Sequence, residues 1–175
     1  TLPAFLEDIE RGSPQRFYTT RRFPDIRQTP VPDWELINFK QYATMSIQFS
    51  RGCPFNCDFC NVTALFGHRP RIKTADQIVA ELDSLYERGW RGQVFFVDDN
   101  FIGNKRNLMK ELLPKLASWK QGKKGRFNTE ASIDLADNPQ LIEMMVQAGF
   151  DTVFIGIETP DEASLAECNK KQNKN

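Results

Sequence analysis

Four short segments of the chain show the residue pattern of β-strands. In the segment 44–50, the apolar residues Met45, Ile47 and Phe49 alternate with polar ones. This period of two is expected of a strand whose two faces meet different surroundings. Segments of strand character recur at 93–97, 127–133 and 152–157, and the last of these is an almost continuous apolar run. The pattern therefore predicts four strands.

Segments with helical periodicity separate these strands. Between residues 74 and 89, a capping-box pattern precedes apolar residues that recur every three or four positions, and Gly89 provides the stop. Further helices are predicted for 105–120, where Pro114 should kink or break the helix, and for 139–148. Shorter helical stretches are predicted at residues 2–9 and after residue 160.

The alternation of strands and helices predicts parallel strands joined by right-handed crossovers, and hence an α/β fold. Segment 127–133 has a polar face as well as an apolar one. In a parallel sheet covered by helices, such a polar face should line a lumen that holds a ligand, with functional groups gathered at the C-terminal strand ends. The candidate residues at these ends are Asp98, Asp99, Ser132 and Glu158, with Glu130 two residues before Ser132.

The most informative stretch runs from Arg51 to Cys60 and holds three of the four cysteines in the spacing C-x3-C-x2-C. So short a run rarely directs its Cβ atoms for unstrained disulfides, but it can place three thiolates around one face of a cubic iron–sulfur cluster. Such clusters are usually held by four cysteines, so here one iron would stay open to a ligand. The predicted metal ligands are Cys53, Cys57 and Cys60, with Phe55 and Phe59 shielding the cluster from water.

Two other interpretations start from the same cysteines. A zinc ion could be held by the three thiols with His68 or Cys168 as the fourth ligand, or the thiols could be unrelated and buried. A single histidine in a polar loop is usually only solvated, and Cys168 lies far along the chain on a polar helix. We assign neither as a ligand. The spacing, the aromatic neighbour and the position at a strand end together favour the cluster.

The cysteine motif, with Phe59 just before its last cysteine, resembles that of the radical S-adenosylmethionine (SAM) superfamily. The resemblance runs from about Tyr42 to the end of the chain. It points most to the cobalamin-associated branch, which includes anaerobic oxidative-cyclase-like enzymes and methylases. The resemblance implies a partial (β/α)6 TIM barrel, of which this chain would supply about four β/α units as an open half-barrel.

The resemblance also implies an enzyme with two cofactors, a [4Fe–4S] cluster and SAM. In the family the open iron takes the amino and carboxylate groups of SAM. The reduced cluster then passes one electron to the sulfonium, giving methionine and a 5′-deoxyadenosyl radical that abstracts a substrate hydrogen. The cofactors carry the chemistry and the protein orients them. A cyclase, a methylase or an oxidoreductase would all fit this scheme, and cobalamin would be held by a domain outside this chain.

The remaining SAM contacts are also placed by resemblance. Asp98 and Asp99 stand where the family has its motif for the SAM amino group, although this sequence reads Asp-Asp-Asn instead of the common Gly-Gly-Glu. Glu130, Ser132 and Glu158 would reach the ribose hydroxyls or the methionyl end, since a carboxylate can accept two hydrogen bonds from a diol. From the residues alone, Asp98 or Asp99 could instead cap the following segment, and Glu130 could be an ordinary lumen carboxylate.

Composition narrows the set of partners. The 175 residues include 23 basic and 23 acidic ones, so overall charge gives no reason to expect nucleic-acid or membrane-surface binding. No apolar run approaches the roughly 20 residues that span a bilayer, and we expect a cytoplasmic protein with reduced thiols. The resemblance implies a small-molecule substrate, an electron donor of the flavodoxin or ferredoxin type, an upstream cobalamin-binding domain and a downstream remainder of the barrel.

The chain divides into two parts by composition. Residues 1–43 hold five of the ten prolines and several arginines, which predicts an irregular linker, with a basic binding arm as the alternative. Residues 44–175 would form the N-terminal part of the radical SAM domain. Because the chain begins without Met and ends in a polar run, we expect a fragment of a larger protein, inactive by itself because its lumen is open to water.

Overall fold

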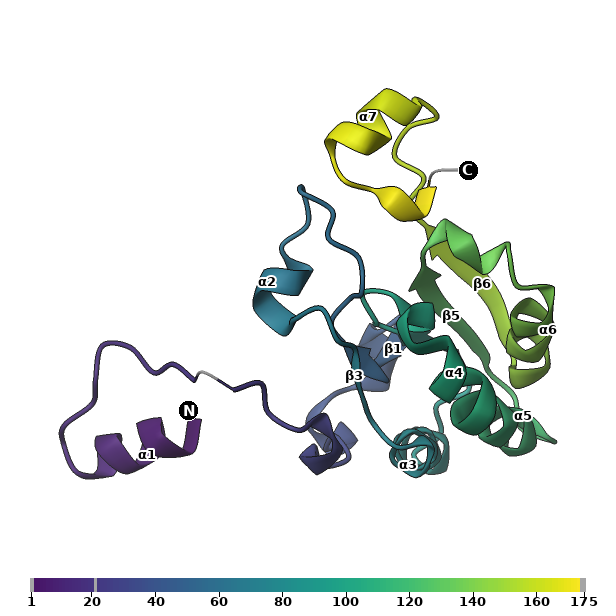
Figure 1. The fold of residues 1–175 in the computed structure, drawn as a ribbon. Coiled ribbons are helices and arrows are strands. Elements are labelled where there is room, and N and C mark those ends of the chain that lie inside the picture. The colour runs from purple at the N-terminus through teal and green to yellow at the C-terminus, as the bar shows by residue number, and fades with distance from the viewer. Residues whose placement is uncertain (1, 21, 174–175) are drawn as a thin grey trace.

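The computed structural model describes residues 2–20 and 22–173 and contains a four-stranded parallel sheet (Figure 1). The strands are paired in the order β1-β4-β5-β6, which is their order along the chain. A helical segment lies between each strand and the next. This arrangement confirms the predicted α/β fold with parallel strands. The strand bounds are β1 Thr44–Ile47, β4 Gln93–Phe96, β5 Arg126–Ala131 and β6 Phe150–Ile155.

Capping residues mark the start of α3 and both ends of α6. Helix α3 (Ala75–Glu87) starts with both hydrogen bonds of the Thr74–Gln77 capping box. In α6 (Pro139–Ala148), Asn138 caps the first turn and Gly149 ends the helix with a φ of 99°, a conformation that glycine adopts without steric cost. The other α-helices that follow β1 are α2 Val62–Phe66, α4 Lys105–Asn107, α5 Leu113–Lys120 and α7 Glu162–Glu167.

The predicted break in the 105–120 helix takes the form of a π-helical turn. Residues Leu108–Leu112 form this turn between α4 and α5, and Pro114 follows in the first turn of α5. Proline has no N–H to donate to a carbonyl four residues earlier, so a regular α-helix cannot run through this position unchanged. The break is therefore confirmed, and its physical cause is the missing donor.

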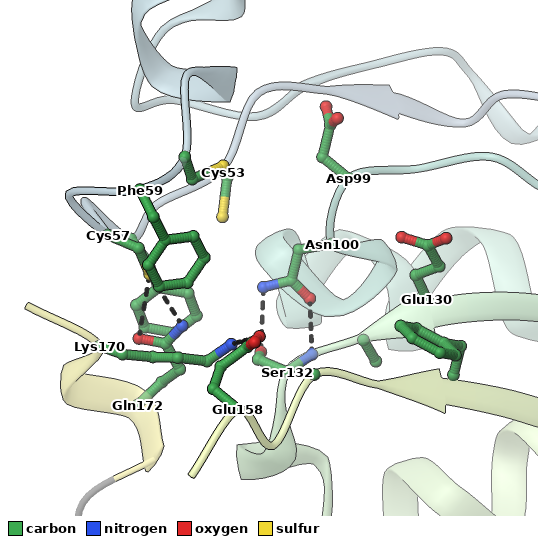
Figure 2. Close-up of a pocket in the computed structure, with 15 residues that line it drawn as sticks. Cys53, Cys57, Phe59, Asp99, Asn100, Glu130, Ser132, Glu158, Lys170 and Gln172 are labelled. Carbon is green, nitrogen blue, oxygen red and sulfur yellow. Dashed lines mark hydrogen bonds and ion pairs between the residues drawn. The ribbon is translucent and has the colours of Figure 1, made fainter. Parts of the chain in front are cut away.

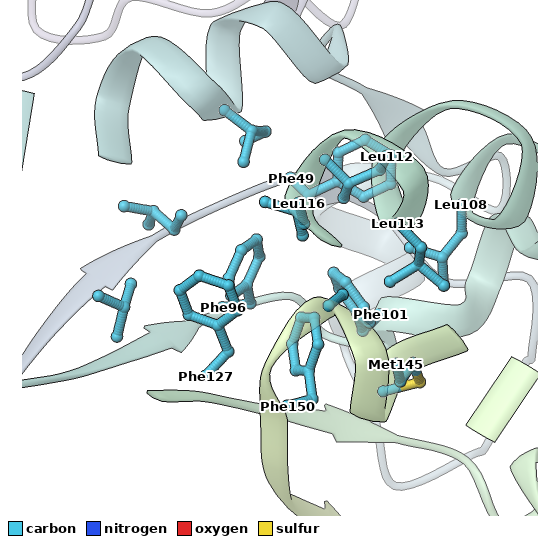
Figure 3. Packing of buried hydrophobic residues seen from close by; sticks show 14 of the residues in the cluster. Phe49, Phe96, Phe101, Leu108, Leu112, Leu113, Leu116, Phe127, Met145 and Phe150 are labelled. Atoms are coloured by element: carbon cyan, nitrogen blue, oxygen red, sulfur yellow. The ribbon is translucent and has the colours of Figure 1, made fainter. Parts of the chain in front are cut away.

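The core fills the face of the sheet that the helices cover (Figure 3). Its centre is aromatic: the ring centroid of Phe96 lies 5.3 Å from those of Phe101 and Phe127 and 5.1 Å from that of Phe150. Leucines of the π turn and α5 pack around these rings, among them Leu108, Leu112, Leu113 and Leu116. In β1, β4 and β5 one residue in two is therefore buried beneath the helices, whereas β6 buries only Phe150.

The first predicted strand is shorter than expected. It ends at Ile47 instead of Ser50, and Ser50–Arg51 forms a separate strand, β2, that pairs antiparallel with β3 (Arg71–Ile72). The cause is Asp98, whose carboxylate accepts hydrogen bonds from the backbone N–H groups of Phe49 and Ser50. These two donors are satisfied by a side chain, so they do not continue the parallel ladder.

The third and fourth strands also differ at their ends from the prediction. Strand β5 stops at Ala131, and Ser132 precedes a 3-10 turn at Ile133–Leu135. Strand β6 starts at Phe150 and stops at Ile155 instead of spanning 152–157. Glu158 therefore does not follow the strand directly but lies three residues beyond it. Its φ of 66° marks a tight turn of the backbone at that point.

The N-terminal segment lies mostly at the surface. Helix α1 (Leu2–Glu10) buries none of its residues, and Figure 1 shows it apart from the sheet. Three 3-10 turns follow at Ile26–Gln28, Trp34–Leu36 and Phe39–Gln41, and Ile26 is buried. The domain division at residues 43 and 44 stays a prediction. In the described ranges, no helix has the length and apolar character needed to cross a membrane.

Candidate functional site

A cavity of about 200 Å³ lies at the C-terminal ends of the strands, between the cysteine loop and the sheet (Figure 2). All three loop cysteines line it, together with side chains that lie at or just beyond the C-terminal ends of β4, β5 and β6. The lining residues are Cys53, Phe55, Cys57, Phe59, Cys60, Asp99, Asn100, Glu130, Ala131, Ser132, Phe154, Gly156, Glu158, Lys170 and Gln172. The cavity therefore gathers nearly every site residue that the sequence predicts.

The base of the cysteine loop is held by close backbone packing. The N–H of Cys53 donates to the carbonyl of Gly67 at 3.3 Å. Gly52 has a φ of 104°, and a Cβ atom there would lie 2.7 Å from the same carbonyl oxygen. Only glycine tolerates both conditions. Gly52 thus lets the chain enter the loop tightly, with Cys53 as its first residue.

The three loop cysteines are free thiols at the edge of the cavity. Cys53 and Cys57 are partly buried and Cys60 is exposed. Burial raises the pKa of the Cys53 thiol, because a low-dielectric surrounding disfavours the charged thiolate. A cationic metal centre reverses this preference, since metal binding deprotonates the thiol. Cys53 is therefore suited to the thiolate form when a positive centre is bound beside it.

The two neighbouring aspartates at the end of β4 have different roles. Asp98 is 1% exposed and is not part of the cavity lining, because its carboxylate is turned towards Phe49 and Ser50. Burial raises its pKa to about 6, with the hydrogen bonds from Ser50 and Phe49 acting in the opposite direction. The structure gives Asp98 the role of fixing the end of β1. Whether Asp98 also contacts SAM stays a prediction.

Asp99 and Asn100 take the positions beside the cavity. One carboxylate oxygen of Asp99, Oδ2, is buried and has no hydrogen-bond partner among the described residues. The side chain of Asn100 is 3% exposed: its Nδ2 donates to Ser132 Oγ at 3.0 Å, and its Oδ1 accepts from the Ser132 N–H at 3.3 Å. This pair ties the end of β4 to the end of β5. The sequence analysis missed Asn100, although it belongs to the polar run that follows the strand.

Glu158 enters the cavity in an ion pair that the sequence did not reveal. Its Oε1 lies 2.6 Å from Lys170 Nζ, and Lys170 is only 7% exposed. The same ammonium lies 5.5 Å from the centroid of the Phe59 ring, which places it over the aromatic face. Glu130 lines the cavity further along β5. The structure thus adds one buried cation to the carboxylates predicted from the sequence.

Residues 168–173 fasten the cysteine loop from the other side. The Asp58 N–H donates to the carbonyl of Cys168 at 3.0 Å, and Asn169 Nδ2 donates to the carbonyl of Asn56 at 2.6 Å. Gln172 Nε2 lies 3.4 Å from Cys57 Sγ and donates to it (Figure 2). Lys170 and Gln172 stand in a polar run that looks like a solvated tail, so only the fold reveals their position.

The structure brings neither candidate fourth zinc ligand into the cavity lining. His68 is exposed and Cys168 is partly buried, and neither lines the cavity. Within residues 2–20 and 22–173, no three His, Cys, Asp or Glu side chains form a group that could hold a single metal ion. A zinc site needs all its sulfurs at about 2.3 Å from one ion, whereas three cysteines on a cluster bind three different irons. Cluster ligands need not converge on one ion, so the arrangement of the three cysteines is compatible with a cluster.

Comparison with known proteins identifies the family. The sequence profile described as the radical SAM superfamily matches residues 47–175, most of the chain. The chain belongs to the radical SAM superfamily. It is 52% identical over 175 residues to an uncharacterised methyltransferase of Synechocystis, covering 99% of this chain and 32% of that protein. It is 42% identical over 168 residues to the hopanoid C-2 methylase of Rhodopseudomonas palustris, covering 95% of this chain and 32% of the methylase.

Solved structures of radical SAM enzymes share the fold. OxsB, a cobalamin-dependent radical SAM enzyme with aqua-cobalamin and SAM bound, superimposes with a TM-score of 0.78 at 17% identity, covering 99% of this chain and 29% of OxsB. The methyltransferase TsrM from Kitasatospora setae gives a TM-score of 0.65 at 18% identity, covering 78% of this chain and 26% of TsrM. The predicted partial-barrel fold is thus confirmed.

The radical SAM chain spans about a third of the length of the curated relatives named above. The family implies a [4Fe–4S] cluster and SAM, and the chain holds the cysteine motif that the sequence analysis assigned to them. None of the relatives named here points to a zinc protein.

Proposed function

We propose that this chain is the cluster- and SAM-binding part of a radical SAM methylase. The observation that carries the proposal is the cavity, in which the three-cysteine loop faces the C-terminal strand ends and their carboxylates. The methylase assignment is supported by two relatives, at 52% and 42% identity, whose names describe methyl transfer. A cyclase remains the second candidate, because an anaerobic magnesium-protoporphyrin IX monomethyl ester cyclase is 25% identical over 163 residues.

Cys53, Cys57 and Cys60 would hold the cluster as thiolates. The donor set fits, since all three thiols line one cavity and Gln172 already donates a hydrogen bond to Cys57 Sγ. When bound and reduced, the cluster supplies one electron to the sulfonium of SAM and so generates the radical on which the chemistry depends. Phe55 and Phe59, which also line the cavity, would restrict the access of water to this centre.

The carboxylates around the cavity would orient SAM. Asp99 would accept hydrogen bonds from the SAM amino group through its buried and unpartnered Oδ2, because an unpartnered buried acceptor gains most from a charged donor. Glu130 and Ser132 would reach the ribose hydroxyls, as both line the same wall. Lys170 would face the carboxylate of the methionyl end, with Glu158 holding its ammonium in place. Asp98 is left out of this set.

The partners beyond this chain follow from the same proposal. The superimposed enzyme OxsB carries bound cobalamin, which supports a cobalamin-binding domain outside this chain as a partner. An electron donor of the flavodoxin or ferredoxin type would reduce the cluster, and the remaining barrel strands would contribute most contacts to a small-molecule substrate. A cytoplasmic location, where thiols stay reduced, would suit the cysteines.

Anaerobic reconstitution with iron and sulfide tests the proposal. The reconstituted protein should show a broad brown absorption that bleaches on reduction, and it should bind SAM in calorimetry. Reduction in the presence of SAM should release methionine. Zinc on the loop would give no visible absorption, so a colourless protein with one zinc per chain would overturn the cluster assignment. A brown protein that fails to bind SAM would overturn the assignment of the cavity.

A further inference from the structure

A second cavity, outside the cluster site, is lined by three arginines. It has a volume of about 460 Å³, and α2, β3, Arg51 and the N-terminal segment contribute its lining side chains. We call it the arginine cavity. It is lined by Thr20, Arg22, Phe23, Pro24, Arg51, Ala64, Leu65, Phe66 and Arg71. Among these described residues there is no acidic side chain, so the cavity carries positive charge without a built-in counterion.

Arg71 occupies the wall of this cavity in a fixed orientation. Its Nη1 donates to the carbonyl of Pro24 at 2.6 Å, and its guanidinium carbon lies 4.9 Å from the centroid of the Phe23 ring. Its Nε is buried and has no partner among the described residues. Carbonyl oxygens and an aromatic face hold a guanidinium in place but carry no net negative charge. Arg71 is therefore oriented by the fold without being neutralised.

The other two arginines are not neutralised either. In the described part of the chain, no ion pair joins a carboxylate to Arg22, Arg51 or Arg71, whereas four other arginines have such partners. Arg51 donates through Nε to the neutral Gln48 Oε1 at 2.6 Å. Burial, followed by the charge of Arg51, lowers the pKa of Arg71, yet a guanidinium remains protonated at neutral pH. Like charges that line one cavity favour an anionic occupant.

We propose that the arginine cavity binds a phosphate group carried by a ligand with an apolar portion. Planar guanidinium groups match the oxygens of phosphate in paired hydrogen bonds, which makes arginine the preferred side chain for this anion. The remaining walls, from Phe23, Ala64, Leu65 and Phe66, are apolar and would contact the rest of the ligand. A hollow of this volume favours a small ligand or a lipid head group over the flat surface of an acidic protein.

A phosphate bound in the arginine cavity would restrain the cysteine loop, because the backbone joins the two sites. Arg51 lies two residues before Cys53, and Phe66 precedes Gly67, whose carbonyl accepts from the Cys53 N–H. A phosphate held by Arg51 and Arg71 would thus tie both ends of the loop to the N-terminal segment. This inference goes beyond the proposed function and does not depend on a cluster or on SAM.

The test uses the protein without cofactors and two sources of phosphate. Inorganic phosphate and pyrophosphate are titrated by calorimetry at low ionic strength, and phosphatidylglycerol vesicles are compared with phosphatidylcholine vesicles by co-sedimentation. The variants are Arg22→Gln, which changes an exposed arginine of the cavity, and Arg51→Gln. Arg106→Gln, an exposed arginine on α4 outside the cavity lining, is the matched control. Circular dichroism checks that each variant folds.

The wild-type protein and Arg106→Gln should bind pyrophosphate equally, with Arg22→Gln and Arg51→Gln each weaker by roughly tenfold or more, since a hydrogen bond to a charged group contributes about 1.5–3 kcal/mol. Binding to phosphatidylglycerol vesicles alone, lost in the same two variants, would support the site and identify a lipid head group as the source. Absence of all phosphate binding, or equal weakening in Arg106→Gln, would overturn the proposal.

Discussion

The two faces of the sheet are built from the same strands but differ in burial and in the pairing of their polar atoms. In β5, Phe127, Thr129 and Ala131 point under the helices and are buried, whereas Asn128 and Glu130 point to the open face and remain partly exposed. On the helix-covered face, rings pack against rings and Thr129 Oγ1 donates to the Phe96 carbonyl at 3.0 Å. On the other face, Asn128 Oδ1 and Asp99 Oδ2 have no partner among the described residues.

The difference separates what stabilises the fold from what binds a ligand. The covered face satisfies its own contacts, so its residues should determine the free energy of unfolding. The open face leaves polar atoms unpaired and keeps Phe154 at 68% exposure, and an unpaired buried polar atom costs stability unless a ligand meets it. Mutations on the helix-covered face should therefore change the free energy of unfolding, and mutations on the open face should change ligand binding.

The largest effect should come from exchanging one phenylalanine for alanine on each face. Phe96→Ala removes a ring that is 0% exposed and packed against three others, and should lower the free energy of unfolding by roughly 3–5 kcal/mol. Phe154→Ala, on the open face of β6, should change it by less than about 1 kcal/mol. Urea denaturation measures both. Equal losses at the two positions would contradict the division between the faces.

The next largest effect should be on the pH dependence of stability and should come from Asp98, an ionisable residue that is buried. Its folded-state pKa of about 6 lies above the ordinary 3.8, so the folded chain binds this proton more tightly than the unfolded chain. The resulting stability is present in full below about pH 4 and is lost as the pH rises through about 6, a loss of up to about 3 kcal/mol. Asp98→Asn should remove this pH dependence.

Urea denaturation of both proteins at pH 4, 5, 6 and 7 measures that difference. The other carboxylates are common to the two proteins, so their contributions cancel when the curves are subtracted. A difference that stays constant between pH 4 and 7, or that grows in favour of the wild type as the pH rises, would show that Asp98 is ionised throughout.

The sequence predicts the covered face well and the strand ends poorly. Alternation and capping depend on neighbours within a few residues, so the four strands and the α3 capping box could be recognised. The end of β1 depends on Asp98, about fifty residues later in the chain, which takes the N–H groups of Phe49 and Ser50. No local pattern contains that contact, and the predicted strand therefore ran on to Ser50.

The open site was predictable only where its chemistry is local. The cysteine spacing is complete within eight residues, so it could be recognised directly. Lys170 and Gln172 reach the cavity because α7 turns the chain back towards the loop, and their polar surroundings in the sequence resemble a solvated tail. Assigning Asp98 to the site was reasonable from its strand end, but its neighbours Asp99 and Asn100 are the residues that line the cavity.

A smaller effect is expected from Glu158 on the open face. Glu158→Ala should weaken SAM binding to the reconstituted protein by roughly 1.5–3 kcal/mol, because Lys170 then loses the carboxylate that holds it 2.6 Å away. Stability should change less than affinity. Glu167→Ala, an exposed glutamate on α7, is the matched control. Calorimetry that finds the same SAM affinity in all three proteins would leave Glu158 with a structural role only.

The smallest effect should come from Gln172. Its N–H donates to Cys57 Sγ, and hydrogen bonds to the sulfurs stabilise the more negative, reduced cluster. Gln172→Leu should make the reduction potential more negative by roughly 20–60 mV, the one-electron equivalent of about 0.5–1.5 kcal/mol. Gln140→Leu, an exposed position on α6, should leave it unchanged. A potential that does not move, or that rises, would show that the Gln172 amide does not stabilise the reduced cluster.

The most direct test of the account replaces the four cysteines with alanine one at a time. Iron and sulfide are then counted in each variant after anaerobic reconstitution. Cys53, Cys57 and Cys60 line the open cavity and Cys168 does not. Cys53→Ala, Cys57→Ala and Cys60→Ala should each lose the cluster, and Cys168→Ala should keep about four irons and four sulfides per chain, as expected for one [4Fe–4S] centre. Loss of the cluster in Cys168→Ala, or its retention in any of the other three variants, would contradict the assignment.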